Sequence, residues 1–267
     1  MTPSDLLRVD GLTCRFGGLL AVDSLSFVLG QGQLMGLIGP NGAGKTTVFN
    51  LLAGAVRPTG GRVFYREHEI TGKKAHRINR LGLARTFQNI RLFGELSALD
   101  NVLVGFHGHL QANFLSAILR LPGYVAAERQ MLSRSAELLD LVGLGELKDE
   151  RAGNLAYGQQ RLLEIARALA TRPSLLLLDE PAAGMNPQET AQLAVLVRRL
   201  RDELGLTILL IEHDMHFVMN LCETLVVLDH GKVIARGEPA AVRCDPGVIE
   251  AYLGVEVDLD ACEAPGA

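Results

Sequence analysis

The alternation of short apolar runs with amphipathic segments predicts most of the architecture of this chain. Five segments have apolar residues at the three- and four-residue spacing of helices, namely residues 46–54, 126–142, 159–170, 187–204 and 215–221. Short apolar segments suited to strands lie at residues 6–9, 26–29, 33–38, 61–65, 83–87, 175–178, 207–211 and 224–228. Strands that alternate with helices along the chain predict an α/β fold with a mainly parallel sheet covered on both faces.

Three regions depart from this alternation. Residues 5–30 and 61–70 combine alternating polar and apolar positions with glycine-rich turns, which predicts a small antiparallel β layer beside the main sheet. Residues 89–156 contain no strand pattern and are mostly helical, so we expect an inserted helical subdomain. The stretch 255–267 is acidic and ends in Ala-Pro-Gly-Ala, a composition typical of a disordered tail.

Composition and charge narrow the function classes. The chain has 267 residues, of which 48% are hydrophobic, so it can bury a sizeable core. Its net charge of -4 argues against a nucleic-acid-binding protein, which would carry a basic balance or stripe. Its apolar runs are too short to span a bilayer and its first residues do not resemble a signal peptide, so we expect a cytoplasmic protein.

The sequence Gly-Pro-Asn-Gly-Ala-Gly-Lys-Thr-Thr, between a predicted strand and a predicted helix, matches the pattern GxxxxGK[ST] of a phosphate-binding loop. Glycines allow successive backbone N–H groups to turn inward as an anion nest, and the following helix adds the positive end of its dipole. The lysine would reach the β and γ phosphates, and the first threonine would place its hydroxyl on Mg²⁺. The predicted nucleotide contacts are Gly39, Asn41, Gly42, Gly44, Lys45, Thr46 and Thr47.

Polar residues that directly follow predicted strands are further candidates, because ligands bind beyond the carboxyl ends of parallel strands. Asp179 would hold the Mg²⁺ shell and Glu180 would polarise the attacking water, or the pair would simply cap a strand. Gln88 would orient that water and touch the metal, or be a solvated loop residue. His213 would contact the γ phosphate or make local hydrogen bonds. Phe16 would stack on an adenine ring or pack in the core.

A second glycine-led helix start lies at Leu-Ala-Tyr-Gly-Gln, residues 155–159. The N-terminus of a helix is a natural anion site, which makes Tyr157, Gly158 and Gln159 candidate nucleotide contacts. Because the chain has one phosphate loop, this second site is predicted to serve the nucleotide of another chain.

With these motifs assembled, the chain resembles the nucleotide-binding subunit of ABC transporters over about residues 6–254. GPNGAGKTT, Gln88, LAYGQ, LLLLDE and His213 match the order of the family's phosphate loop, Q-loop, signature, Walker B element and switch histidine. The stretches LAYGQQRLLEIARAL, DEPAAGMNPQET, IEHDM and GEPAAVRCDPGVIEAYLG are similar to the ATPase subunit of branched-chain amino-acid uptake systems. The signature has Ala156-Tyr157 where most of the family has Ser-Gly, and Asn186 stands where an aspartate is common, as in the branched-chain subgroup.

The resemblance implies a single ABC ATPase domain, residues 1–254. Its catalytic core and antiparallel layer would lie at 5–88 and 160–235, a helical signature subdomain at 89–159 and a C-terminal helical extension at 236–254.

The resemblance also implies ATP and Mg²⁺ as cofactors, and a second ABC ATPase subunit, identical or related, that faces this one head to tail across two ATP molecules. Membrane permeases would be contacted through the Gln88 loop and the helical subdomain, including the apolar Ile90, Leu92, Phe93 and Leu96.

By the same resemblance, the protein is peripheral on the cytoplasmic side of the inner membrane, works indirectly with a periplasmic binding protein and binds no nucleic acid. Three alternatives stay open: another cargo such as lipid or lipopolysaccharide, a soluble ABC-type ATPase with a non-membrane partner, and a non-catalytic regulatory subunit. The intact Lys45, Asp179, Glu180 and His213 argue against the last.

Overall fold

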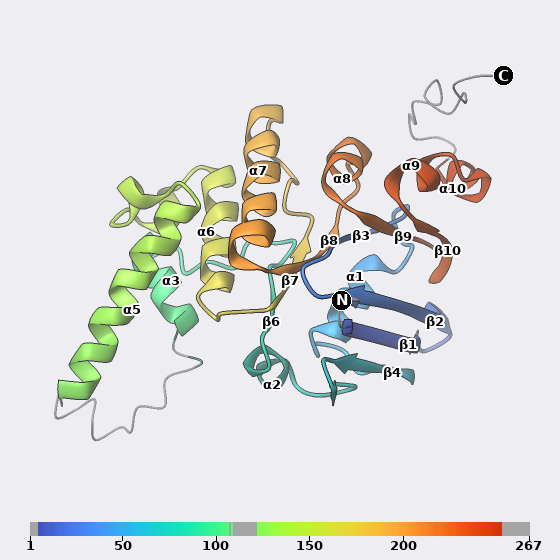
Figure 1. Ribbon diagram of the computed structural model, residues 1–267, viewed down its shortest axis with the longest axis horizontal. Coiled ribbons are helices and arrows are strands. Elements are labelled where there is room, and N and C mark those ends of the chain that lie inside the picture. The colour runs from blue at the N-terminus through green and yellow to red at the C-terminus, as the bar shows by residue number, and fades with distance from the viewer. Residues whose placement is uncertain (1–4, 107, 109–121, 253–267) are drawn as a thin grey trace.

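A computed structural model describes residues 5–106, 108 and 122–252, and its main framework is a six-stranded sheet (Figure 1). The strand order is β10-β9-β3-β8-β7-β6. The first five strands in chain order are mutually parallel and β10 runs antiparallel to β9. The strands are β3 (Leu34–Ile38), β6 (Leu83–Arg85), β7 (Leu175–Asp179), β8 (Thr207–Ile211), β9 (Thr224–Asp229) and β10 (Lys232–Gly237). The predicted α/β fold with a mainly parallel sheet is confirmed.

The central strands are buried on both faces, which explains their unbroken apolar runs. In β7, Leu175 and Leu177 pack into one hydrophobic core, and Leu176 and Leu178 pack into another on the opposite face. The first core lies between the large sheet and a smaller one, and the second lies under the helices. Burial on both faces is therefore consistent with the interior position of β7 in the sheet. Its carboxyl end, at Asp179, lies at one edge of the sheet.

The smaller sheet is antiparallel, as predicted, with the order β2-β1-β4-β5. Helix α1 (Lys45–Leu52) lies between the two sheets and buries Phe49 there (Figure 1). The strands are longer than the predicted runs at 6–9 and 26–29, because register shifts between β1 and β2 interrupt the alternation that the sequence pattern relies on. They are β1 (Asp5–Phe16), β2 (Leu19–Gly30), β4 (Gly60–Tyr65) and β5 (His68–Glu69).

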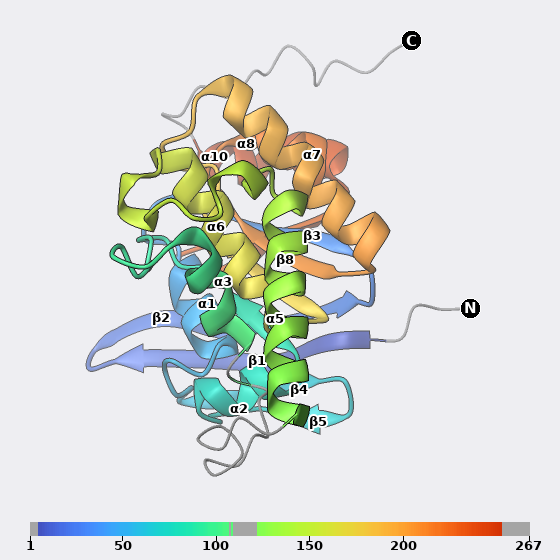
Figure 2. The same cartoon turned by 90° about the vertical axis from the view of Figure 1, so that its left-hand side faces the viewer.

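Helices cover the other face and one end of the large sheet. Figure 2 shows α5 (Pro122–Leu141) running along α3 (Ala98–Phe106) and α6 (Tyr157–Leu169). Short turns at η2 (Gly145–Leu147) and η3 (Ala152–Asn154) lead into α6. The remaining helices are α2 (Ala75–Arg80), α7 (Pro187–Leu204), α8 (Met215–Leu221), α9 (Pro239–Arg243) and α10 (Pro246–Ala251).

Two boundaries that matter for function differ from the sequence prediction. The predicted strand at 83–87 ends at Arg85, so Phe87 and Gln88 lie outside the sheet. The helix predicted to begin at residue 159 begins at Tyr157, which puts the whole Tyr-Gly-Gln segment in its first turn. The predicted disordered tail at 255–267 lies outside the described residues. In the part of the chain that is described, no helix is long and apolar enough to cross a bilayer.

Candidate functional site

The loop that joins β3 to α1 has the backbone geometry of a phosphate cradle. Gly39, Gly42 and Gly44 all have positive φ angles, of 149°, 83° and 100°. A Cβ at Gly39 would overlap the carbonyl oxygen of Leu228, and one at Gly44 would overlap that of Ala21. Gly39 and Gly44 therefore need both a positive φ angle and the absence of a Cβ, and only glycine provides both. The loop therefore leads into the N-terminus of α1 along a path that suits the binding of an anion by backbone N–H groups.

Lys45, the first residue of α1, reaches back over this loop. Its ammonium donates to the carbonyl oxygens of Gly39, at 2.6 Å, and Pro40, at 2.9 Å. Burial lowers the pKa of Lys45, and the nearby carboxylates of Glu180 and Asp179 oppose that shift. The positive charge is thus held beside the cradle, with two acidic groups close by.

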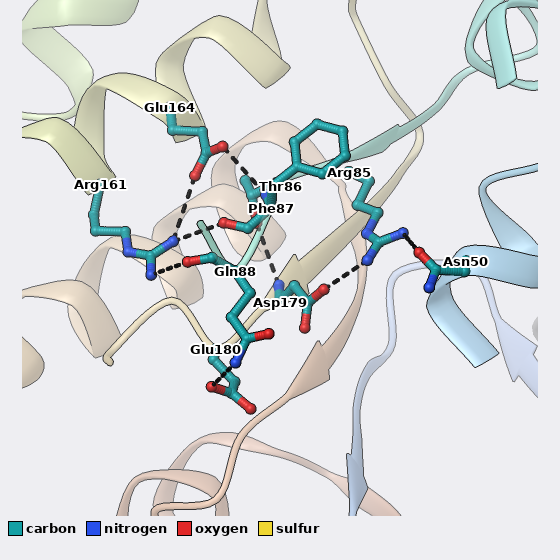
Figure 3. A network of polar contacts seen from close by, with 9 residues as sticks. All are labelled: Asn50, Arg85, Thr86, Phe87, Gln88, Arg161, Glu164, Asp179 and Glu180. Atoms are coloured by element: carbon teal, nitrogen blue, oxygen red, sulfur yellow. Dashed lines mark hydrogen bonds and ion pairs between the residues drawn. The ribbon is translucent and has the colours of Figure 1, made fainter. Parts of the chain in front are cut away.

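Asp179 ends β7 and is fully buried. Its Oδ2 accepts a hydrogen bond of 2.7 Å from Arg85, which also donates to Oδ1 of Asn50 at 2.7 Å (Figure 3). Burial raises the pKa of Asp179, and the Arg85 guanidinium opposes that shift. Among the described residues, Oδ1 of Asp179 is buried without a hydrogen-bond partner. A buried, unsatisfied carboxylate oxygen at the end of a strand fits a hard cation.

Glu180 directly follows β7 in a left-handed backbone conformation with a φ of 47°. Such a conformation is strained for a residue other than glycine and is often found at functional sites. Its backbone N–H donates to the carbonyl of Ile211 at 2.9 Å, which anchors it to β8. Its side chain accepts a hydrogen bond of 3.0 Å from Nε2 of Gln88 (Figure 3). The structure therefore brings together two polar residues that lie far apart in the sequence.

A cleft of about 400 Å³ lies at this edge of the sheet, and Gly39 and Asp179 are not among the residues that line it. Phe16 is 49% exposed at one side of this cleft, so it is not the core residue that one alternative supposed. The predicted residues that line it are Phe16, Asn41, Gly42, Gly44, Lys45, Thr46, Thr47, Gln88 and Glu180. The cleft thus joins the phosphate loop to the predicted base and water contacts in one cavity.

The cleft also contains His230, which the sequence analysis missed. His230 directly follows β9 and has a positive φ of 43°. Because β9 is parallel to β3, its carboxyl end lies at the same edge of the sheet. The strand-end rule that selected Gln88 and Glu180 would also have selected His230.

His213 lies beyond β8 but is not among the residues that line this cleft. Its Nδ1 is 3.6 Å from a carboxylate oxygen of Glu212. Glu212 is fully buried and accepts hydrogen bonds from the amides of Ala182, at 2.7 Å, and His213, at 3.2 Å. Glu212 therefore fixes the loops after β7 and β8 and is a second residue that the sequence analysis missed.

The first turn of α6 holds the remaining candidates, away from the cleft. Gln159 accepts a hydrogen bond of 3.0 Å from the amide of Ala156, which caps the helix. A Cβ at Gly158 would come within 2.8 Å of a carboxylate oxygen of Glu189, and Tyr157 packs against Gly184 in the loop before α7. Gly158 and Gln159 line a separate cleft of about 500 Å³. Within one chain, this turn does not meet the phosphate loop.

A phosphate loop, a buried strand-end carboxylate and a following glutamate at the carboxyl edge of a parallel sheet define a phosphate-loop ATPase. The ABC transporter family model matches residues 22–183, and the model described as "Branched-chain amino acid ATP-binding cassette transporter" matches residues 232–258. The chain therefore belongs to the ABC transporter ATP-binding family. It binds ATP and hydrolyses it in connection with transport, which confirms the expected class of enzyme.

Over nearly its whole length, the chain is similar to ATP-binding proteins of several transport systems. The high-affinity branched-chain amino acid transport ATP-binding protein BraF of Pseudomonas aeruginosa is 50% identical over 249 residues, which cover 93% of this chain and 98% of BraF. LivG of Escherichia coli strain K12, with the same description, is 47% identical with the same coverage. The lipopolysaccharide export system ATP-binding protein LptB of Acidithiobacillus ferridurans is 36% identical over 96% of this chain and 100% of LptB.

Solved structures have the same fold. A nucleotide-free ATP-binding cassette from an ABC transporter superposes with a TM-score of 0.82 at 32% identity, over 93% of this chain and 98% of that one. The ADP conformation of the ATP-binding cassette MJ1267 gives a TM-score of 0.82 at 33% identity, over 94% of this chain and 99% of that one.

Proposed function

We propose that this chain is the motor subunit of an importer for branched-chain or related amino acids. The observation that carries the proposal is the 50% identity to BraF across 93% of the chain, together with the separate match at residues 232–258. A lipid or lipopolysaccharide cargo is disfavoured by the lower identity of 36% to LptB.

In this proposal, the β and γ phosphates lie in the loop at residues 39–47 with Lys45 beside them. Thr46, Gln88 and Asp179 would hold Mg²⁺, and the unsatisfied Oδ1 of Asp179 supports this assignment. Bound Mg²⁺ would neutralise charge on the transferred phosphoryl group. The ammonium of Lys45 would leave its two backbone carbonyls for phosphate oxygens, which are stronger, charge-assisted acceptors.

Glu180 would polarise the attacking water, with Gln88 orienting it and His213 contacting the γ phosphate. The hydrogen bond between Gln88 and Glu180 supports a shared position at the reacting end of the cleft. The exposed ring of Phe16 would stack on adenine at the other end.

The second half of each ATP site would come from another ABC ATPase subunit, identical or related. Tyr157, Gly158 and Gln159 lie on α6, outside the cleft that holds Lys45. Their separation within one chain supports a head-to-tail pair in which they contact the partner's nucleotide. The first turn of α6 would then direct its N–H groups at the γ phosphate.

Membrane permeases would dock beside the Gln88 loop. A groove of about 370 Å³ is lined there by Phe87 and Phe93, and Phe93 is 51% exposed. Leu96 is also exposed, whereas Leu92 packs against the core of the helical region, so Phe93 and Leu96 are the better contacts. The chain would sit on the cytoplasmic side of the inner membrane and act indirectly with a periplasmic binding protein.

We also propose residues 1–254 as one ABC ATPase domain, with core segments 5–88 and 160–235, a helical signature subdomain at 89–159 and an extension at 236–254. The boundary at residue 159 falls inside α6, so this helix would connect the core to the helical subdomain.

Uptake of radiolabelled leucine tests the proposed cargo. Vesicles would contain this chain with its permeases and binding protein, and ATP would be supplied on the side of this chain. Leucine should accumulate with the wild-type chain and stay outside with the Glu180→Gln variant. ATP-driven extraction of lipopolysaccharide without leucine uptake would contradict the proposal.

A further inference from the structure

Helix α6 carries a buried ion pair that the proposed ATP chemistry does not use. Arg161 and Glu164 lie 3.6 Å apart, and their side chains are 3% and 2% exposed. Burying two charges is costly unless further hydrogen bonds compensate for the lost water. The contacts of this pair therefore indicate what it is for.

Both side chains bind the backbone at Phe87 and Gln88. Arg161 donates from Nη1 to the carbonyl oxygen of Phe87, at 2.7 Å, and from Nη2 to that of Gln88. Glu164 accepts a hydrogen bond of 3.2 Å from the amide of Phe87 (Figure 3). Three backbone groups of two consecutive residues are thus held by α6.

The residue before them is held by the sheet. The amide of Thr86 donates to the carbonyl of Leu177 at 3.0 Å, and its hydroxyl accepts from the amide of Asp179 at 3.2 Å. Thr86 is therefore hydrogen-bonded to β7, whereas the next residue, Phe87, is hydrogen-bonded to α6. The side chain of Gln88 then returns to the end of β7, where it donates to Glu180.

We propose that Arg161 and Glu164 are positioning residues that make the backbone of Gln88 follow α6. The backbone of Gln88 is bonded to α6, and its side chain donates to Glu180 at the end of β7, so a shift of α6 against β7 would bring the Gln88 side chain to Glu180 or withdraw it. This inference rests on the roles proposed above for Gln88 and Glu180.

The same guanidinium extends the link to the first turn of α6. Nη2 of Arg161 donates to the phenol oxygen of Tyr157 at 2.9 Å, and the Tyr157 ring packs against Gly184. The turn proposed to face the partner's nucleotide is thereby joined, through one side chain, to the loop proposed to face the permease. Most of the family has glycine at the position of Tyr157, and a glycine could not supply the hydroxyl that accepts this hydrogen bond from Arg161.

The test is a double variant, Arg161→Met with Glu164→Met, in the full-length chain. Apolar replacements of similar volume remove a buried ion pair without leaving one charge unpaired, so the fold should persist. We expect kcat for ATP hydrolysis to fall by about tenfold, because a catalytic group is misplaced by a small distance. Titrated ATP affinity should be unchanged, and amide exchange at residues 86–90 should become faster. Arg199→Met with Glu203→Met, an exposed pair on α7, is the matched control and should leave all three unchanged.

A folded double variant with wild-type kcat would overturn the inference, provided that Gln88→Ala lowers kcat. If Gln88→Ala keeps wild-type kcat, the role proposed for Gln88 is wrong, and amide exchange alone then tests whether Arg161 and Glu164 hold the backbone of Gln88 to α6. Faster exchange at residues 86–90 in the double variant would support this inference, and unchanged exchange would overturn it. Should the double variant not fold, Arg161→Lys retains the charge but cannot bridge both carbonyls and the phenol, and the same outcomes apply to it.

Discussion

At the scale of single residues, the site depends on acidic side chains that the fold keeps out of water. Asp179 and Glu212 follow or end adjacent strands, and both are fully buried. Asp179 has Arg85 as a charged partner, whereas Glu212 relies on two backbone amides. A buried carboxylate without a strong cationic partner favours its neutral form. This difference makes Glu212 the better probe of how pH acts on the fold.

We predict that Glu212→Gln changes the pH dependence of stability. Burial raises the folded-state pKa of Glu212 above its ordinary 4.5, and the amides of Ala182 and His213 oppose the shift. The stability it contributes is therefore present below pH 4.5 and is lost as pH rises through the raised value. The neutral glutamine does not undergo this loss, so the melting temperature of the variant relative to that of the wild type should rise as the pH increases from 4.5 through the raised pKa of Glu212.

Melting curves of both proteins across that pH range test the prediction. Glu67→Gln, on the exposed surface, is the matched control and should show no such trend. A difference between Glu212→Gln and wild type that stays constant with pH would mean that folding does not raise the pKa of Glu212.

At the scale of secondary structure, the N-terminal cap of α7 determines where the loop after β7, which contains Glu180, ends. Asn186 caps α7: its side chain accepts from the amide of Glu189 at 3.0 Å, and Glu189 accepts in return from the amide of Asn186 at 2.9 Å. Pro187 follows at the first helical position. This capping box explains why asparagine can stand where an aspartate is common, since either supplies the oxygen that the cap needs.

Asn186→Ala should lower the free energy of unfolding by about 1 kcal/mol, because the amide of Glu189 in the first turn of α7 loses its side-chain acceptor. Urea unfolding measures the change through its midpoint. Asn186→Ser retains a capping oxygen and should stay close to wild type. Equal loss in both variants would show that Asn186 acts through something other than the cap.

Strong local signals made some elements predictable. Helices α7 and α8 were predicted from their apolar spacing with the bounds that the structure shows, and Asn186 and Asp214 cap their starts. By contrast, α2 buries only Ile78 and has no periodic face, so it was missed. The edge strand β10 was missed because its residues are mostly exposed and its apolar run, Val233 to Ala235, is short.

At the scale of the whole molecule, parallel topology made much of the site predictable. Lys45, Gln88 and Glu180 meet because β3, β6 and β7 end at one edge, and this followed from reading apolar runs as parallel strands. The tether from α6 to Gln88 could not be predicted. Arg161 and Glu164 look like ordinary helix-surface charges in the sequence, and only the packing of α6 against the loop buries them.

Because the phosphate loop and the first turn of α6 are separate in one chain, ATP should control association between chains. We predict that Glu180→Gln binds ATP normally but hydrolyses it about 10²- to 10⁴-fold more slowly, since the group that polarises water loses its charge. ATP would then persist between two chains, and size-exclusion chromatography with Mg²⁺ and ATP should show a dimer.

Lys45→Ala combined with Glu180→Gln removes the ammonium that holds the phosphates, so this double variant should stay monomeric under the same conditions. Wild-type turnover in Glu180→Gln would refute the role of Glu180, and an ATP-dependent dimer of the double variant would show that association does not require nucleotide held by the phosphate loop.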